Sequence, residues 1–146
     1  MKTDPVKLSE EYFESGYGCA ESVLMAIAVS QNIKSELVPR IASGFCGGMA
    51  LTNGLCGAVA GGVMAINLIY GRDNNHQNKD INYQKVQEFI SEFKARFGSL
   101  NCPDLTDCDI STDEGKEKFD VLNVHKKCTQ YTVEATKLVY NSIKSI

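Results

Sequence analysis

The segment L-C-G-A-V-A-G-G-V-M-A-I-N-L-I-Y, residues 55–70, decides the fold, because it is an uncharged run of helical length that begins with small residues. We predict a buried helix over this segment, with Gly71 as its stop. Gly57 and Gly61 lie one helical turn apart and would let a neighbouring helix approach the backbone closely. The run contains Asn67 and is shorter than the roughly 20 residues of a membrane span, so no contact with a membrane is expected.

Helical patterns lie on both sides of this segment. The clearest one covers about residues 81–97, where Phe89 and Phe93 belong to an apolar face at helical spacing. Ser111 and Glu114 match a capping box for a later helix. The other predicted helices cover about residues 5–15, 19–32, 35–43, 111–122 and 124–143. Because no segment alternates apolar and polar residues, we predict an all-α fold, a compact bundle of about five to seven helices around a glycine-rich buried central helix.

Length and composition indicate one globular unit. The 146 residues suit a single domain, and 43% apolar and 23% charged residues are typical of globular proteins. The net charge of -3 provides no broad positive field, which argues against nucleic acid as a partner. Lys116 and Asp120 belong to a stretch of mixed charge that is typical of a solvated face. We therefore predict that residues 1–146 form one domain that binds neither nucleic acid nor membranes.

The six cysteines are the unusual feature of the composition. The N-terminal residues contain neither an apolar export segment nor a twin arginine, which predicts a cytoplasmic location. In a reducing compartment, groups of cysteines more often bind metal or carry out redox chemistry than form structural disulfides. No C-x-x-C motif occurs in the chain, so any cysteine cluster must be assembled from distant segments.

Four cysteines share a position at or near the start of a helical segment. Cys19 opens its predicted helix, and Cys56 lies in the first turn of the glycine-rich helix. Cys128 lies in the first or second turn of the last helix, and Cys102 precedes Pro103 at the entry to a helical turn. Unpaired N–H groups and the helix dipole stabilise a thiolate at such places. The placement therefore predicts low thiol pKa values, nucleophilic reactivity and metal ligation.

Four motifs, taken in order, resemble the C-GCAxxG-C-C family, which is associated with redox function. They are G-C-A-E-S-V-L around Cys19, F-C-G-G-M-A-L-T-N-G-L-C-G-A-V-A-G-G around Cys56, N-C-P-D-L-T-D-C-D-I-S-T-D-E-G after Leu100, and H-K-K-C-T-Q-Y-T-V-E-A around Cys128. The hallmark C-G-A-x-x-G covers residues 56–61, and the resemblance extends from about residue 16 to residue 138.

The resemblance implies a set of ligands and a cofactor. The four family positions are Cys19, Cys56, Cys102 and Cys128. Cys46 and Cys108 are additional candidates of lower rank. By this resemblance the chain would bind an iron-sulfur cluster and exchange electrons with a redox partner protein, as an electron carrier or an oxidoreductase component. Gly57 and Gly61 of the hallmark are the candidates for cofactor binding. Cys56, also in the hallmark, and Cys19 are the candidates for catalytic thiols.

Two other functions remain open from the residues alone. The first is cluster-free thiol-disulfide chemistry in which Cys56 is a nucleophile of low pKa. The second is a structural zinc site held by four thiolates. His76 and His125 are expected to be surface residues rather than ligands. The small residues of the central helix would serve packing within one chain or across a homodimer, and both arrangements remain open.

Overall fold

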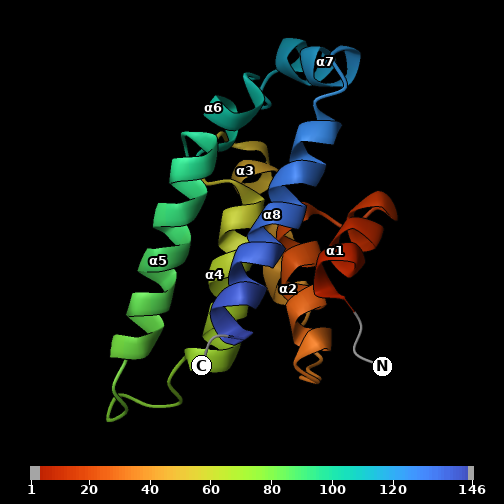
Figure 1. The fold of residues 1–146 in the computed structure, drawn as a ribbon. Helices are drawn as coiled ribbons and strands as arrows, with labels where there is room; N and C mark the ends of the chain where they lie inside the picture. Colours follow the sequence, from red (N-terminus) through yellow and green to blue (C-terminus); the bar gives the residue numbers. More distant parts are fainter. Residues whose placement is uncertain (1–3, 145–146) are drawn as a thin grey trace.

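Helices form all of the regular structure in this computed structural model, which describes residues 4–144 (Figure 1). The elements of this part of the chain are α1 (Pro5–Glu14), α2 (Cys19–Ser30), a 3₁₀-helix η1 (Arg40–Phe45), α3 (Cys46–Leu51), α4 (Gly57–Tyr70), α5 (Asp80–Phe97), α6 (Cys102–Thr106), α7 (Asp113–Val121) and α8 (His125–Lys144). The predicted all-α class is confirmed. Among the described residues there are eight helices besides η1, rather than about five to seven. The short helices α3 and α6 form where we expected turns, whereas the predicted helix over 35–43 is replaced by turns and η1.

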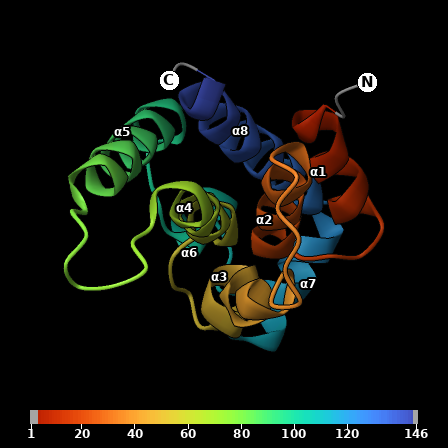
Figure 2. The same cartoon turned by 90° about the horizontal axis from the view of Figure 1, so that it is seen from below.

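Helix α4 contacts elements on several sides. It packs against α2, α5, α8, η1 and α3, and Figure 2 shows it nearly end-on between α5, α8 and α2. Its buried residues are mostly small: Gly57, Ala58, Val59, Ala60, Gly61, Gly62, Ala65 and Ile66. Burial of most of its first ten residues explains why this part of the helix carries no charge, because a buried charge without a partner is costly.

Two glycines of α4 allow its neighbours to approach the backbone. A Cβ atom added to Gly61 would lie 2.6 Å from the carbonyl oxygen of Ala20 in α2. A Cβ atom added to Gly62 would overlap the ring of Phe89 in α5. The helix pairs α2–α4 and α4–α5 therefore depend on the absence of side chains at these positions.

Local hydrogen bonds define where the helices begin. The N–H group of Gly18 donates to the carboxylate of Glu21 at 2.9 Å, which satisfies one free donor at the start of α2. Helix α7 is capped by Thr112, whose hydroxyl accepts from the N–H group of Gly115 at 3.0 Å. The predicted cap at Ser111 was therefore wrong by one residue, because Ser111 instead hydrogen-bonds to an aspartate before the helix.

The segment α3 is wound in the left-handed sense. The φ angles of Gly47, Gly48, Met49, Ala50 and Leu51 are 65°, 66°, 63°, 56° and 67°. The two glycines adopt this conformation freely, whereas each residue with a side chain loses about 1–2 kcal/mol in it. Backbone strain of this kind persists only where the surrounding structure holds it in place.

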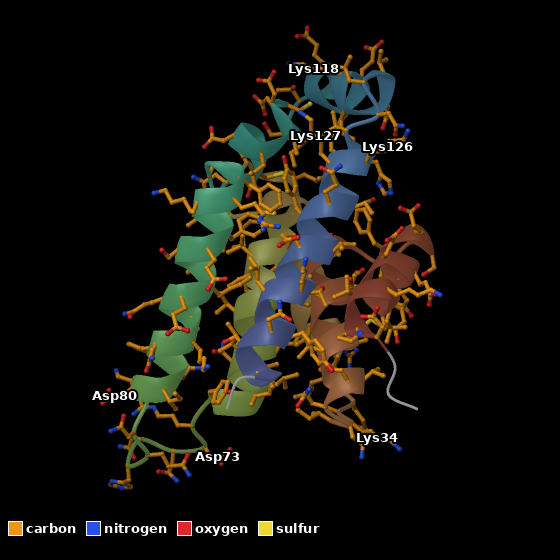
Figure 3. All side chains as sticks on the ribbon, viewed as in Figure 1. Lys34, Asp73, Asp80, Lys118, Lys126 and Lys127 are labelled. Carbon is orange, nitrogen blue, oxygen red and sulfur yellow. The ribbon has the colours of Figure 1, made fainter. Side chains whose placement is uncertain are left out.

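Charged side chains project from both ends of the bundle (Figure 3). Lys118, Lys126 and Lys127 lie at the end that carries α7, and Asp73 and Asp80 lie at the opposite end. Among residues 4–144, no helix combines the length and the apolar character that crossing a membrane requires.

Candidate functional site

A cavity of about 370 Å³ lies at the end of the bundle where α2, α4 and α6 begin. Its lining is largely apolar and includes Phe13, Leu51, Leu105, Ile110, Phe119 and Tyr131. Helix α7 contributes the two charged residues of the lining, Lys116 and Asp120. The lining of the cavity is thus mostly apolar, with two charged residues from α7.

Four cysteine residues line this cavity: Cys19, Cys56, Cys102 and Cys128. They are contributed by the start of α2, the residue before α4, the start of α6 and the first turn of α8. The fold thus brings four segments that are distant in the sequence to one space. The candidates of lower rank, Cys46 and Cys108, are not part of the lining.

A short antiparallel bridge between Leu55 and Asn101 joins the segments that carry Cys56 and Cys102. The N–H group of Cys56 donates to the carbonyl oxygen of Leu100 at 2.8 Å, and the N–H group of Cys102 donates to the carbonyl oxygen of Gly54 at 2.9 Å. The bridge satisfies backbone groups just ahead of α4 and α6. The sequence contained no signal for it, because a pairing of this length has no periodic pattern.

Glycines make room for two of the sulfur-bearing side chains. A Cβ atom on Gly57 would overlap the Sγ atom of Cys19, and one on Gly48 would lie 2.5 Å from the Cβ atom of Cys102. Both glycines line the cavity. Gly61, the other predicted cofactor-binding glycine, is not part of the lining and lies against the backbone of α2.

The pKa values of Cys56, Cys102 and Cys128 are raised rather than lowered. Burial raises the pKa of Cys56 to about 11, although the N–H groups of Ala58 and Val59 at the start of α4 act in the opposite direction. Burial and the neighbouring cysteines raise the pKa of Cys128 to about 12. Burial is also the main cause that raises the pKa of Cys102. The expectation of low thiol pKa values was therefore wrong at these positions, because loss of water outweighs the donors of the helix start.

Sequence analysis missed three other lining residues. Tyr131 in α8 donates a hydrogen bond of 2.6 Å to the carbonyl oxygen of Leu105, which ties α8 to α6 beside the thiols. Lys116 and Asp120 were assigned to a solvated face, and both also border the cavity. Nothing in the spacing of α7 distinguished these two residues from its other charged side chains.

The side chains that could ligate a metal are spread around the cavity and do not meet at one point. Within residues 4–144, no three His, Cys, Asp or Glu side chains lie close enough together to hold a single metal ion. The four cysteines therefore line one cavity without converging on a single metal-sized point.

A comparison with protein families finds a match for most of the sequence. The family model described as "Putative redox-active protein (C_GCAxxG_C_C)" matches residues 17–142. The chain belongs to the C_GCAxxG_C_C family. This C_GCAxxG_C_C protein is also 26% identical over 147 residues to an "Uncharacterized protein" from Archaeoglobus fulgidus, a match that covers 93% of this chain and 91% of that protein. No solved structure was found to match the chain.

Proposed function

We propose that this C_GCAxxG_C_C protein carries electrons by means of an iron-sulfur cluster held by Cys19, Cys56, Cys102 and Cys128, and that it exchanges them with a redox partner protein. The observation that carries the proposal is the arrangement of four cysteines, from four separate segments, around one cavity. The redox description of the family supports the same conclusion.

The residues fit such a cofactor in their chemistry. Cysteine thiolates are the usual ligands of iron-sulfur clusters, and the bound cluster supplies one-electron transfer. A cluster has its own iron and sulfide atoms between the thiolates, which suits ligands that surround a space. The N–H groups of Ala58 and Val59, which act on the Cys56 thiol, would tune the site. The apolar lining would exclude water from it.

Burial favours metal-bound thiols over free ones at this site. A thiol with a pKa of about 11, as at Cys56, is almost fully protonated at neutral pH and is a weak nucleophile. A bound metal cation changes this balance, because it deprotonates the thiols that coordinate it. This argues against Cys56 as the nucleophile of a cluster-free thiol-disulfide protein. A structural zinc ion would need four thiolates at about 2.3 Å from one point, so the cavity would have to close.

The test is metal analysis of protein purified without oxygen. We expect the wild type to be coloured and to contain iron together with acid-labile sulfide. Cys56→Ser should lose most of this iron, because one ligand from the cavity wall is removed. Cys108→Ser is the matched control, since Cys108 is buried but is not part of the lining. It should keep the iron content of the wild type.

Other outcomes would reject the proposal. Colourless wild-type protein that contains zinc would favour the structural metal site instead. Wild-type protein without metal that cannot be reconstituted with iron and sulfide would favour cluster-free chemistry. Equal iron in the wild type and in Cys56→Ser would remove Cys56 from the ligand set.

A further inference from the structure

A second cysteine lies beside Cys19, outside the lining of the cavity. Cys46, at the start of α3, lies close enough to Cys19 that this neighbouring side chain is the main cause of a raised pKa of the Cys46 thiol. The position that a Cβ atom of Gly57 would take overlaps the Sγ atom of Cys19 and lies 3.3 Å from the Cα atom of Cys46. Cys19 and Cys46 are therefore direct neighbours, although 26 residues separate them along the chain.

Gly18 provides the space for this contact from the other side. A Cβ atom on Gly18, the residue before Cys19, would overlap the Sγ atom of Cys46 and lie 2.6 Å from its Cβ atom. The side chain of Cys46 thus occupies the space beside Gly18, and the side chain of Cys19 occupies the space beside Gly57. A larger residue at either glycine would displace one of the two thiols. Both cysteines are only partly buried, so a small reagent has access to them.

A carboxylate accepts a hydrogen bond from the thiol of Cys46. The Sγ atom of Cys46 donates to Oε1 of Glu21 at 3.8 Å and alternatively to the carbonyl oxygen of Ala42 at 3.7 Å. The Glu21 carboxylate is itself held by the N–H group of Gly18 at 2.9 Å and by the hydroxyl of Ser43 at 2.8 Å. Glu21 is therefore a positioned acceptor and not a mobile surface group.

We propose that Cys19 and Cys46 form a reversible disulfide when the cavity holds no cluster, and that this disulfide withdraws Cys19 from the ligand set. The first half of the proposal concerns the chain alone. The second half rests on the proposed function, because it makes the disulfide and the cluster mutually exclusive. The pair would then act as a redox-controlled block on cofactor loading.

The chemistry needs a low-molecular-weight disulfide as oxidant. The Cys19 thiolate attacks one sulfur of this reagent, which breaks its S–S bond, releases one small thiolate and leaves a mixed disulfide on Cys19. Cys46 gives up its proton to the solvent, and its thiolate attacks the Sγ atom of Cys19, which forms the Cys19–Cys46 bond and releases the second small thiolate. The cysteine sulfurs lose two electrons, and the reagent, reduced by these electrons, takes up the two protons as two small thiols.

The first experiment tests the disulfide without any cluster. Reduced, metal-free protein is titrated with oxidised glutathione, quenched with an alkylating agent and digested. Cys46 and Cys56 lie between the same two basic residues, Arg40 and Arg72, so tandem mass spectrometry must separate them within one tryptic peptide. We expect the peptide of Cys19 to be linked to Cys46, with two thiols lost per chain.

Two variants sharpen this experiment. Cys46→Ser should stop at the mixed disulfide, with glutathione retained on Cys19, because the second thiol is missing. Cys108→Ser should form the Cys19–Cys46 bond as the wild type does. A wild type that links Cys19 to another cysteine, or that keeps glutathione on Cys19 without a second step, would overturn the proposal.

The second experiment tests whether the Cys19–Cys46 disulfide prevents the uptake of a cluster. The oxidised chain should take up as little iron as Cys19→Ser during reconstitution with iron and sulfide, and a thiol reductant should restore uptake. Reduced Cys46→Ser should load like the wild type. If Cys46→Ser loses iron as Cys19→Ser does, then Cys46 is a ligand and the inference fails, whereas the proposed function stands. If the disulfide forms but the reduced wild type never holds iron, the proposed function fails and the dithiol pair stands.

Discussion

The Cys56 thiol is subject to two opposing influences. The donors at the start of α4 favour its thiolate, whereas the surrounding protein, which leaves the residue 6% exposed, favours the neutral thiol. The resulting pKa of about 11 shows that burial is the stronger effect. The position of Cys56 at the start of a predicted helix indicated the N–H donors. The burial of Cys56 depends on segments that are distant in the sequence, so the sequence did not indicate it.

The first prediction concerns the reaction of this thiol with an alkylating agent. In metal-free protein, the alkylation rate of Cys56 should rise about tenfold per pH unit and level off near pH 11, because only the thiolate reacts. In denatured protein the rate should level off near the ordinary pKa of 9.0. Mass spectrometry of the Cys56 peptide measures both profiles. A plateau below pH 9 in the folded protein would show that the helix donors outweigh burial.

The second prediction concerns the small residues of α4. Gly61→Ala should reduce the free energy of unfolding by about 1–3 kcal/mol, because the added Cβ atom meets the backbone of Ala20 and overpacks the interface of α2 and α4. Gly44→Ala is the control, since nothing lies within 4 Å of its added Cβ atom. Denaturant unfolding of both variants gives the comparison. Equal stability of Gly61→Ala and the wild type would contradict the close packing.

Single elements were largely foreseeable from the sequence. Periodic apolar residues together with glycine stops predicted α1, α2, α4, α5 and α8 to within a few residues. The same patterns did not predict the left-handed winding of α3, because its glycines are also typical of an ordinary loop. They did not predict the contact of Cys19 with Cys46 either, because that contact depends on how α2 and α3 meet.

The third prediction concerns the left-handed winding of α3. Ala50→Gly should raise the free energy of unfolding by about 1 kcal/mol, because Ala50 has a φ angle of 56° and glycine avoids the strain of that conformation. Ala95→Gly, at an exposed position in the right-handed helix α5, should instead lower it by about 1 kcal/mol. The same chemical change thus has opposite signs at the two sites. Destabilisation by both substitutions in denaturant titrations would contradict a left-handed α3.

Taken as a whole, the fold collects its cavity cysteines from most of the chain. They begin with Cys19 near one end of the sequence and finish with Cys128 near the other. Their common position at helical starts suggested that they act together, and the family resemblance supplied their order. That they line one cavity depends on the bundle as a whole, which pairs α1 with α8 and α2 with α4.

The fourth prediction follows from the wide separation of the four cysteines along the sequence. A cluster held by all four segments would bind the folded state and not the unfolded chain, so reconstitution should raise the midpoint of thermal unfolding. The gain should be lost in Cys128→Ser and retained in Cys108→Ser. Anaerobic thermal scans, before and after removal of iron by a chelator, measure the effect. An unchanged midpoint in the reconstituted wild type would show that the metal is not held by the folded bundle.

The backbone bridge between Leu55 and Asn101 ties the start of α4 to the segment that follows α5. Because the N–H group of Cys56 donates to Leu100 and the N–H group of Cys102 donates to Gly54, α4, α5 and their linker form a closed hairpin that is anchored at the cavity. The linker at the far turn, residues 71–79, is exposed throughout. A fluorophore or an affinity handle placed there would sit at the opposite end from the thiols, which makes the linker the natural attachment point for experiments that look for the redox partner.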